Sequence, residues 1–312
     1  MEYRQLGNSG VRVSVIGLGT NQFGGPVDQE GVNRVIAAAI DLGINFIDTA
    51  DVYQNGRSEE ALGKALNGRW REVVLATKVF NSTGNGPNDW GTSRYHMING
   101  LEDSLRRLQT DHIDLYQMHR WDDTTPAEEM MRTLDDFVAS GKVRYIGASA
   151  YASWQLAKCN LLAEFRGWSS FVTVQSHYHM LERDVENEVL PYCAAHNVGF
   201  IPYFPLAGGF LTGKYKRGEG APAGSRGERS PYVQKYMTDA NYDVVETLSA
   251  WAQERGHTMN ELAHAWLLAQ PQVCSVISGL TKLEHLEANA KAGEWLLTKE
   301  EAAEVTAVLN GE

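Results

Sequence analysis

The chain has 312 residues, of which 43% are hydrophobic and 21% charged, a balance typical of a globular enzyme. Its formal net charge is -11, without a clustered basic stripe, which argues against nucleic acid as the main partner. No apolar stretch approaches the ~20 residues that cross a bilayer, and the N-terminus lacks the apolar core of a signal peptide. We therefore expect a cytoplasmic protein that has no membrane partner.

The N-terminal residues and the first helical pattern are the earliest elements along the chain. Residues 3–13 alternate about a turn at 8–10, which predicts a β-hairpin that closes one end of the fold. Val32, Val35, Ile36 and Ala39 then follow helical spacing, and Gly43 stands where that helix would end.

Later helices are predicted from their ends. Ser58 precedes two glutamates as an N-cap, and Pro126 suits a first helical position in a helix that Gly141 would end. Capping boxes are predicted at residues 258–261, 281–284 and 298–301.

Short apolar segments alternate with these helices, as expected for buried parallel strands. The segments are residues 13–18, 45–47, 73–77, 113–118, 145–148, 171–174, 199–202 and 274–277. Eight such strands, each followed by a helix, predict a (β/α)8 barrel that forms a single domain over residues 1–312. The alternative, an open doubly wound sheet, usually has a G-x-G-x-x-G turn after its first strand, and the glycines of residues 17–24 do not fit that spacing.

Two connections are longer than ordinary barrel loops. Residues 79–93 follow the third strand, and residues 206–240 follow the seventh. Both leave the carboxyl ends of strands, where barrel active sites lie, so we expect them to act as lids.

Polar or aromatic residues stand at the ends of six predicted strands. They are Asp48, Lys78, His119, Ser149, Gln175 and Tyr203. In a barrel these positions share one rim, which predicts a common site.

The motifs around these residues resemble the aldo-keto reductase family. Residues 43–53 read Gly-Ile-Asn-Phe-Ile-Asp-Thr-Ala-Asp-Val-Tyr, and residues 56–63 read Gly-Arg-Ser-Glu-Glu-Ala-Leu-Gly. Further family-like motifs are Val-Leu-Ala-Thr-Lys at 74–78, Ile-Asp-Leu-Tyr-Gln-Met-His at 113–119, Pro-Tyr-Phe-Pro-Leu at 202–206 and the segment 279–289. The resemblance covers nearly the whole chain in order, and it includes the branch of potassium-channel β subunits.

The resemblance implies a catalytic tetrad of Asp48, Tyr53, Lys78 and His119. Tyr53 would donate a proton to the carbonyl oxygen, helped by the positive charge of Lys78, which Asp48 would hold in place. His119 would orient the carbonyl group. The hydride would come from a nicotinamide cofactor, because side chains do not supply hydride.

The resemblance also implies a cofactor site. Its residues would be Gly19, Thr20, Asn21, Asp48, Ser149, Gln175, Tyr203, Leu206, Gly208, Leu211, Gly213, Lys214, Gly279, Thr281, Lys282, Glu287 and Asn289. Lys282 would meet the adenosine 2′-phosphate, which favours NADP(H), and NAD(H) remains an alternative because lysine lacks the bidentate grip of arginine. The chain departs from the family at Ala150, where asparagine is usual, at Phe204, where serine is common, and at Ser278, where proline is common.

A small-molecule carbonyl compound is the expected substrate. Val52, Phe80, Trp90 and Trp121 are candidate walls of an aromatic pocket, and Tyr232 and Tyr236 would reach in from the long seventh loop. No catalytic metal is predicted, since the histidines are scattered and Cys159, Cys193 and Cys274 lack zinc spacing.

Two other functions remain as alternatives, and self-association is left open. One is a regulatory subunit that keeps the cofactor as a redox sensor. The other is an aldolase-type barrel enzyme with Lys78 as a Schiff-base nucleophile.

Overall fold

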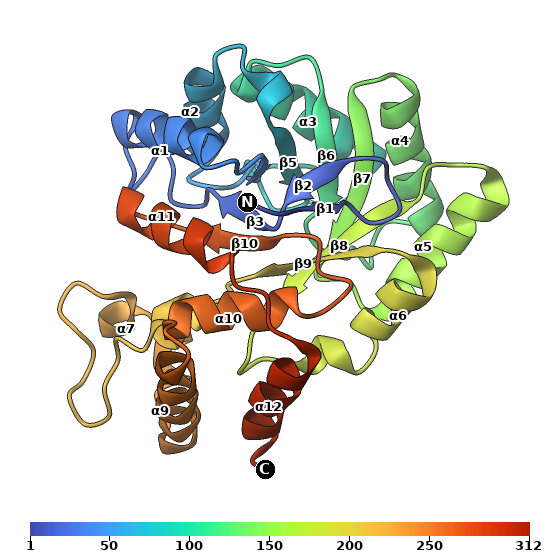
Figure 1. The fold of residues 1–312 in the computed structure, drawn as a ribbon. Helices are drawn as coiled ribbons and strands as arrows, with labels where there is room; N and C mark the ends of the chain where they lie inside the picture. Colours follow the sequence, from blue (N-terminus) through green and yellow to red (C-terminus); the bar gives the residue numbers. More distant parts are fainter.

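The computed structural model describes residues 1–312, and its centre is a closed barrel of parallel strands (Figure 1). Neighbouring strands follow the order β10-β3-β4-β5-β6-β7-β8-β9. The strands are β3 (Ile16–Gly19), β4 (Phe46–Asp48), β5 (Val74–Val79), β6 (Ile113–Met118), β7 (Val143–Ser149), β8 (Phe171–His177), β9 (Gly199–Tyr203) and β10 (Val276–Gly279). The predicted (β/α)8 barrel is confirmed, and closure excludes the open sheet.

Helices surround the barrel and bury its outer face. They are α1 (Gln29–Asp41), α2 (Arg57–Leu66), α3 (Arg94–Leu108), α4 (Ala127–Ala139), α5 (Ser153–Arg166), α6 (Val189–His196), α10 (Met259–Leu268) and α11 (Leu283–Ala292). The long connection after β9 contains the 3-10 segment η3 (Ala207–Thr212) and the helices α7 (Arg226–Arg229), α8 (Pro231–Gln234) and α9 (Asp239–Glu254). Two further 3-10 turns, η1 (Trp70–Glu72) and η2 (Asp184–Glu186), and the C-terminal α12 (Lys299–Asn310) complete the chain. No helix is both long enough and apolar enough to cross a membrane.

The N-terminal hairpin closes the end of the barrel opposite the strand carboxyl ends. β1 (Tyr3–Gln5) pairs antiparallel with β2 (Arg12–Ser14), as predicted. Leu6 and Val13 of this hairpin join the small apolar cluster inside the barrel. Gly7 has a φ of +57°, and a Cβ there would lie 1.9 Å from the carbonyl oxygen of Val172, so only glycine lets the turn fit against the barrel.

Some predicted boundaries were wrong. Residues 13–18 divide between β2 and β3, because the chain passes from the hairpin into the barrel at Val15. Capping boxes form at Thr258 and Thr298 as expected, but α11 begins after Lys282 and Thr281 caps nothing. Ser58 is not an N-cap either.

Three helix-end predictions concern Ser58, Pro126 and Gly141. Ser58 lies buried inside the first turn of α2, where its hydroxyl donates to the carbonyl oxygen of Thr20. Pro126 is the residue just before α4 rather than its first residue, and Gly141 follows the end of that helix with a φ of +78°.

Candidate active site

The carboxyl ends of the strands bring the six predicted rim residues to one end of the barrel. Asp48, Ser149 and Tyr203 are the last residues of β4, β7 and β9. Lys78 and Gln175 lie near the ends of β5 and β8, and His119 directly follows β6. A cavity of about 940 Å³ opens there, and its lining includes all of these residues except the fully buried Lys78. Its volume lies within the range of pockets that bind small molecules.

A buried ion pair forms the floor of this site. The Lys78 Nζ donates to Asp48 Oδ2 over 2.7 Å and to the carbonyl oxygen of Thr49 over 2.8 Å. The exposed fractions of the two side chains are 0% for Lys78 and 3% for Asp48, so water screens the pair very little. Burial opposes the charge of Lys78, but Asp48 and Tyr53 outweigh it and the pKa of Lys78 is raised.

Asp48 is fixed from its other side as well. Its Oδ1 accepts hydrogen bonds from Gln175 Nε2 at 2.9 Å and Gln117 Nε2 at 3.2 Å. Gln175 was expected among the cofactor residues, and Gln117 was not singled out from the sequence. Both amides therefore orient the carboxylate that holds Lys78.

Tyr53 stands between this ion pair and the cavity. Its hydroxyl lies 3.5 Å from Lys78 Nζ, and the ammonium lies 5.1 Å from the centre of its ring. Burial raises the pKa of Tyr53. The hydroxyl is therefore protonated at neutral pH, and the Lys78 charge counteracts only part of the effect of burial.

His119 completes the tetrad on the side of Tyr53. The two rings meet edge to face with 6.0 Å between their centres. Burial, with a smaller contribution from the charges of Lys78 and Arg120, lowers the pKa of His119 to about 3. The imidazole is therefore neutral at physiological pH. Its Nδ1 lies 3.1 Å from Asn81 Nδ2, and with that amide as donor, Nε2 carries the proton and can donate to a substrate oxygen.

The other end of the cavity is positively charged. Lys214, Arg226 and Lys282 line it. The pKa of the neighbouring His285 is lowered, mainly by burial and further by these three positive charges. Gly208 and Gly209, with φ of +68° and +106°, bring bare backbone to the same wall. Cations around glycine backbone fit the phosphates of a dinucleotide.

Most of the predicted cofactor residues line this cavity. Those that do are Gly19, Thr20, Asn21, Asp48, Ser149, Gln175, Tyr203, Leu206, Gly208, Lys214, Gly279, Thr281, Lys282 and Asn289. Leu211, Gly213 and Glu287 do not line it, and Leu211 is fully buried in the core.

Tyr203 lines the cavity with its aromatic ring. His177 stacks against one face of this ring, with 5.4 Å between the ring centres and 11° between the planes. His177 is held in turn by the hydroxyl of Tyr232, 2.6 Å from its Nε2. Tyr232 therefore connects the long loop after β9 to His177 of β8, but it does not line the cavity, where it was expected as a substrate contact.

The four predicted substrate walls lie elsewhere, because the cavity lining includes none of Val52, Phe80, Trp90 and Trp121. Phe80 and Trp90 pack edge to face on each other, with 6.1 Å between their ring centres.

Trp121 and Tyr236 are also engaged in packing. Trp121 packs on Tyr151 and Trp154. Tyr236 is buried and donates to Glu182 over 2.8 Å.

Several functional candidates escaped the sequence analysis. Arg120, Arg226, Asn260 and His285 line the cavity but stand in loops or helices rather than at strand ends. The cations could have been suspected from their place next to His119 and within the long seventh loop.

The histidines are also less scattered than expected. The potential ligand atoms of His177, His179 and Glu182 lie within 4.8 Å of one another. Tyr232 and Tyr236 hydrogen-bond to these side chains, which gives the group a structural role in fixing the loop.

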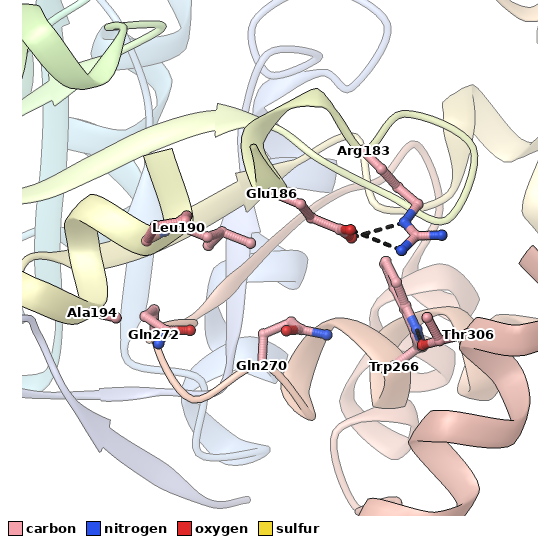
Figure 2. Close-up of a pocket in the computed structure, with 9 residues that line it drawn as sticks. Arg183, Glu186, Leu190, Ala194, Trp266, Gln270, Gln272 and Thr306 are labelled. Carbon is pink, nitrogen blue, oxygen red and sulfur yellow. Dashed lines mark hydrogen bonds and ion pairs between the residues drawn. The ribbon is translucent and has the colours of Figure 1, made fainter. Parts of the chain in front are cut away.

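A second hollow, of about 390 Å³, lies between α6 and α10 (Figure 2). Arg183 and Glu186 form an ion pair on one side of it, and Trp266, Gln270 and Gln272 lie below. Its lining includes none of Asp48, Tyr53, Lys78 and His119.

Comparison with known proteins agrees with this geometry. The model of the aldo/keto reductase family matches residues 15–310. The chain belongs to the aldo-keto reductase family. It is therefore an NAD(P)-dependent oxidoreductase of a family that reduces carbonyl groups.

Similar proteins carry several descriptions. The chain is 41% identical to the uncharacterized oxidoreductase YrpG of Bacillus subtilis, over 96% of this chain and 93% of that protein. It is 37% identical to a probable voltage-gated potassium channel subunit beta of Oryza sativa subsp. japonica, over 99% of this chain and 97% of that protein. It is 33% identical to the versiconal hemiacetal acetate reductase of Aspergillus parasiticus, over 96% of this chain and 95% of that protein.

Proposed function

We propose that this aldo-keto reductase reduces aldehydes and ketones to alcohols with NADPH as the preferred hydride source and Tyr53 as the proton donor. The observation that carries the proposal is the position of Lys78 Nζ, which bonds to Asp48 at 2.7 Å and faces the Tyr53 hydroxyl at 3.5 Å. The bound nicotinamide would supply the hydride. The remaining steps belong to side chains of this chain.

The proton donor and the group that orients the carbonyl are separate. Tyr53 holds a proton at neutral pH, and the adjacent ammonium stabilises the phenolate that forms as the proton leaves. Neutral His119 would donate through Nε2 to the same carbonyl oxygen and fix its direction. The position of the Lys78 ammonium is fixed by its hydrogen bonds to Asp48 and to the carbonyl oxygen of Thr49. Gln117 and Gln175 fix Asp48 in turn.

The cationic end of the cavity supports NADPH over NADH. Lys214, Arg226 and Lys282 gather three charges there, more than a pyrophosphate alone requires. Lys282 is the residue just before α11, where the helix N-terminus adds to the positive potential. An additional phosphate on the adenosine would lower the charge density of this end.

Cofactor titration followed by turnover tests the proposal. We expect both NADPH and NADH to quench tryptophan fluorescence, with tighter binding of NADPH, and the Tyr53→Phe variant to bind NADPH normally but lose turnover of aldehydes. Absence of binding, checked by calorimetry, would remove the proposed cofactor site. Normal turnover by Tyr53→Phe would remove its role as proton donor.

A redox-sensing subunit is a second candidate, supported by the similarity to proteins described as potassium-channel β subunits. This role predicts that NADPH stays bound through purification and that turnover is slow while a single hydride transfer is complete. Rapid multiple turnover would favour the reductase.

The Schiff-base aldolase has less support. A Schiff base needs a neutral amine that reaches the substrate. Lys78 is fully buried, paired with Asp48 and has a raised pKa, so it is charged and shielded from the cavity.

A further inference from the structure

The charges of the cavity lining do not balance. The lining holds the cationic side chains of Arg120, Lys214, Arg226 and Lys282, while Asp48 is its only carboxylate. Asp48 is already neutralised by Lys78. In a chain with a net charge of -11, an electropositive cavity indicates an anionic occupant.

The four cations lie in two groups. Lys214, Arg226 and Lys282 surround His285 at the end assigned to the cofactor phosphates. Arg120 lies at the catalytic end instead, where its charge acts on His119 and on Tyr203. A nicotinamide ring brings no negative charge to that end, so the proposed cofactor leaves Arg120 uncompensated.

No carboxylate of the protein compensates Arg120 either. The nearby Asp122 accepts hydrogen bonds from the backbone and hydroxyl groups of Thr92 and Thr124. Asp123 accepts from Trp121 Nε1 over 2.7 Å. Arg120 itself is exposed, lines the cavity and makes no ion pair or hydrogen bond.

A free guanidinium beside the catalytic histidine is suited to one type of ligand group. Its planar set of donors binds a carboxylate in a bidentate manner, and the group keeps its charge at every physiological pH. Because Arg120 adjoins His119, an anion on Arg120 and a carbonyl oxygen on His119 would belong to one small molecule.

We propose that the substrate is an aldehyde or ketone that also carries a carboxylate, and that Arg120 binds this carboxylate while His119 and Tyr53 bind the carbonyl oxygen. This inference rests on the proposed reductase function and specifies its substrate class. It makes Arg120 a specificity-determining residue that acts on KM more than on kcat.

Two matched pairs of substrates test the inference at saturating NADPH. One pair is 4-carboxybenzaldehyde and methyl 4-formylbenzoate, and the other is 4-oxobutanoate and its methyl ester, so that two distances between carbonyl and charge are sampled. The ester withdraws electrons more strongly, so intrinsic reactivity works against the expected result. We expect kcat/KM for the carboxylate to exceed that for the ester by about 10- to 100-fold in at least one pair, the range for a hydrogen-bonded charge pair.

Variants of Arg120 assign this preference to its charge. Arg120→Met should abolish the preference by raising KM for the carboxylate, with kcat for the esters and NADPH affinity within about twofold. Arg120→Lys should retain part of it. Arg132→Met, which removes an exposed arginine of α4, is the matched control and should change neither substrate.

Several outcomes would overturn the inference. They are equal kcat/KM for acid and ester in both pairs, equal loss on both substrates in Arg120→Met, or weaker NADPH binding in that variant, which would place Arg120 on the cofactor. If the protein turns over no carbonyl compound, the reductase proposal fails separately. Calorimetry with 4-carboxybenzaldehyde and the NADPH complex then decides: Arg120-dependent binding keeps the carboxylate site, and absence of binding rejects it.

Discussion

Lys78 Nζ lies 2.7 Å from Asp48 Oδ2 inside the barrel, and neither side chain has meaningful contact with water. Burial of both charges is costly, and only their mutual contact and the additional bonds from Thr49, Gln117 and Gln175 compensate for it. The barrel thus keeps a fixed positive charge behind Tyr53, although the desolvation of this charge opposes folding.

Removal of one partner should show this cost. We expect Asp48→Asn to lower the free energy of unfolding by about 3–5 kcal/mol, because it leaves a buried ammonium without a counter-charge. Denaturant unfolding without cofactor measures the loss. The Asp48→Asn/Lys78→Met double variant is the control and should be more stable than Asp48→Asn alone; if it is less stable by the sum of both single losses, the two charges are not coupled.

Tyr53 should be required for turnover but not for binding. We expect Tyr53→Phe to lower kcat by at least ~100-fold, the contribution of a general acid, while the Kd of NADPH changes little. In the wild type the raised pKa of Tyr53 keeps the donor protonated, so proton donation should not be lost between pH 6 and 9. Steady-state kinetics over this pH range check both statements, and a fall in kcat with a midpoint near pH 7 would point to another donor.

Lys282 should discriminate between the cofactors. Lys282→Ala is expected to weaken NADPH binding by about tenfold, near the value of one charge-assisted contact, and NADH binding by less than twofold. Lys291→Ala, in the last turn of the α11 helix that follows Lys282, is the control because Lys291 is paired with Glu261. Fluorescence titration of both variants with both cofactors gives the four constants, and equal weakening of NADPH and NADH by Lys282→Ala would contradict recognition of the 2′-phosphate.

Ala150 occupies a backbone conformation that suits a different residue. Its φ is +54°, in the left-handed region where asparagine and glycine are favoured and other L-residues are strained by about 1–2 kcal/mol. We therefore expect Ala150→Asn, which introduces the residue usual in the family, to raise the free energy of unfolding by up to about 1 kcal/mol. Thermal and denaturant unfolding measure this, and a loss of stability would show that the asparagine side chain does not fit beside Ser149.

The barrel could be predicted because its strands are short apolar segments with polar residues at one end. That pattern placed Asp48, Lys78 and His119 on one rim before their distances were known. It could not separate residues 13–18 into hairpin and barrel strand, because Val13, Val15, Ile16 and Leu18 place apolar residues on both sides of the boundary.

The pocket walls were harder to predict than the tetrad. Aromatic residues in loops serve equally well as packing, and the structure shows Trp121 edge to face with Trp154 and Phe80 edge to face with Trp90. Ser278, which stands where proline is common, accepts or donates a hydrogen bond with His264 over 2.7 Å. Such pairings depend on residues distant in sequence and become visible only after the chain has folded.

His264 should make stability sensitive to acid. It is fully buried, which lowers its pKa to about 4, and it bonds to the carbonyl oxygen of Asn260 and to Ser278. The unfolded chain has a histidine pKa near ~6.5, so between pH 6.5 and 4 the unfolded state binds more protons than the folded state. Stability from neutral His264 is therefore complete above pH 6.5 and is lost as the pH falls, by about 1.4 kcal/mol per pH unit in that window.

Substitution of His264 by a residue that does not titrate isolates this effect. Gln can keep one donor and one acceptor at the same place, so His264→Gln should fold and should reduce the slope of unfolding free energy against pH by one proton. His119 and His179, whose pKa values are also lowered to about 3, contribute equally to both proteins and cancel in the difference. Urea unfolding at half-unit steps from pH 4.5 to 7.5 measures the two slopes, and identical slopes would mean that His264 has the same pKa in the folded and unfolded chain.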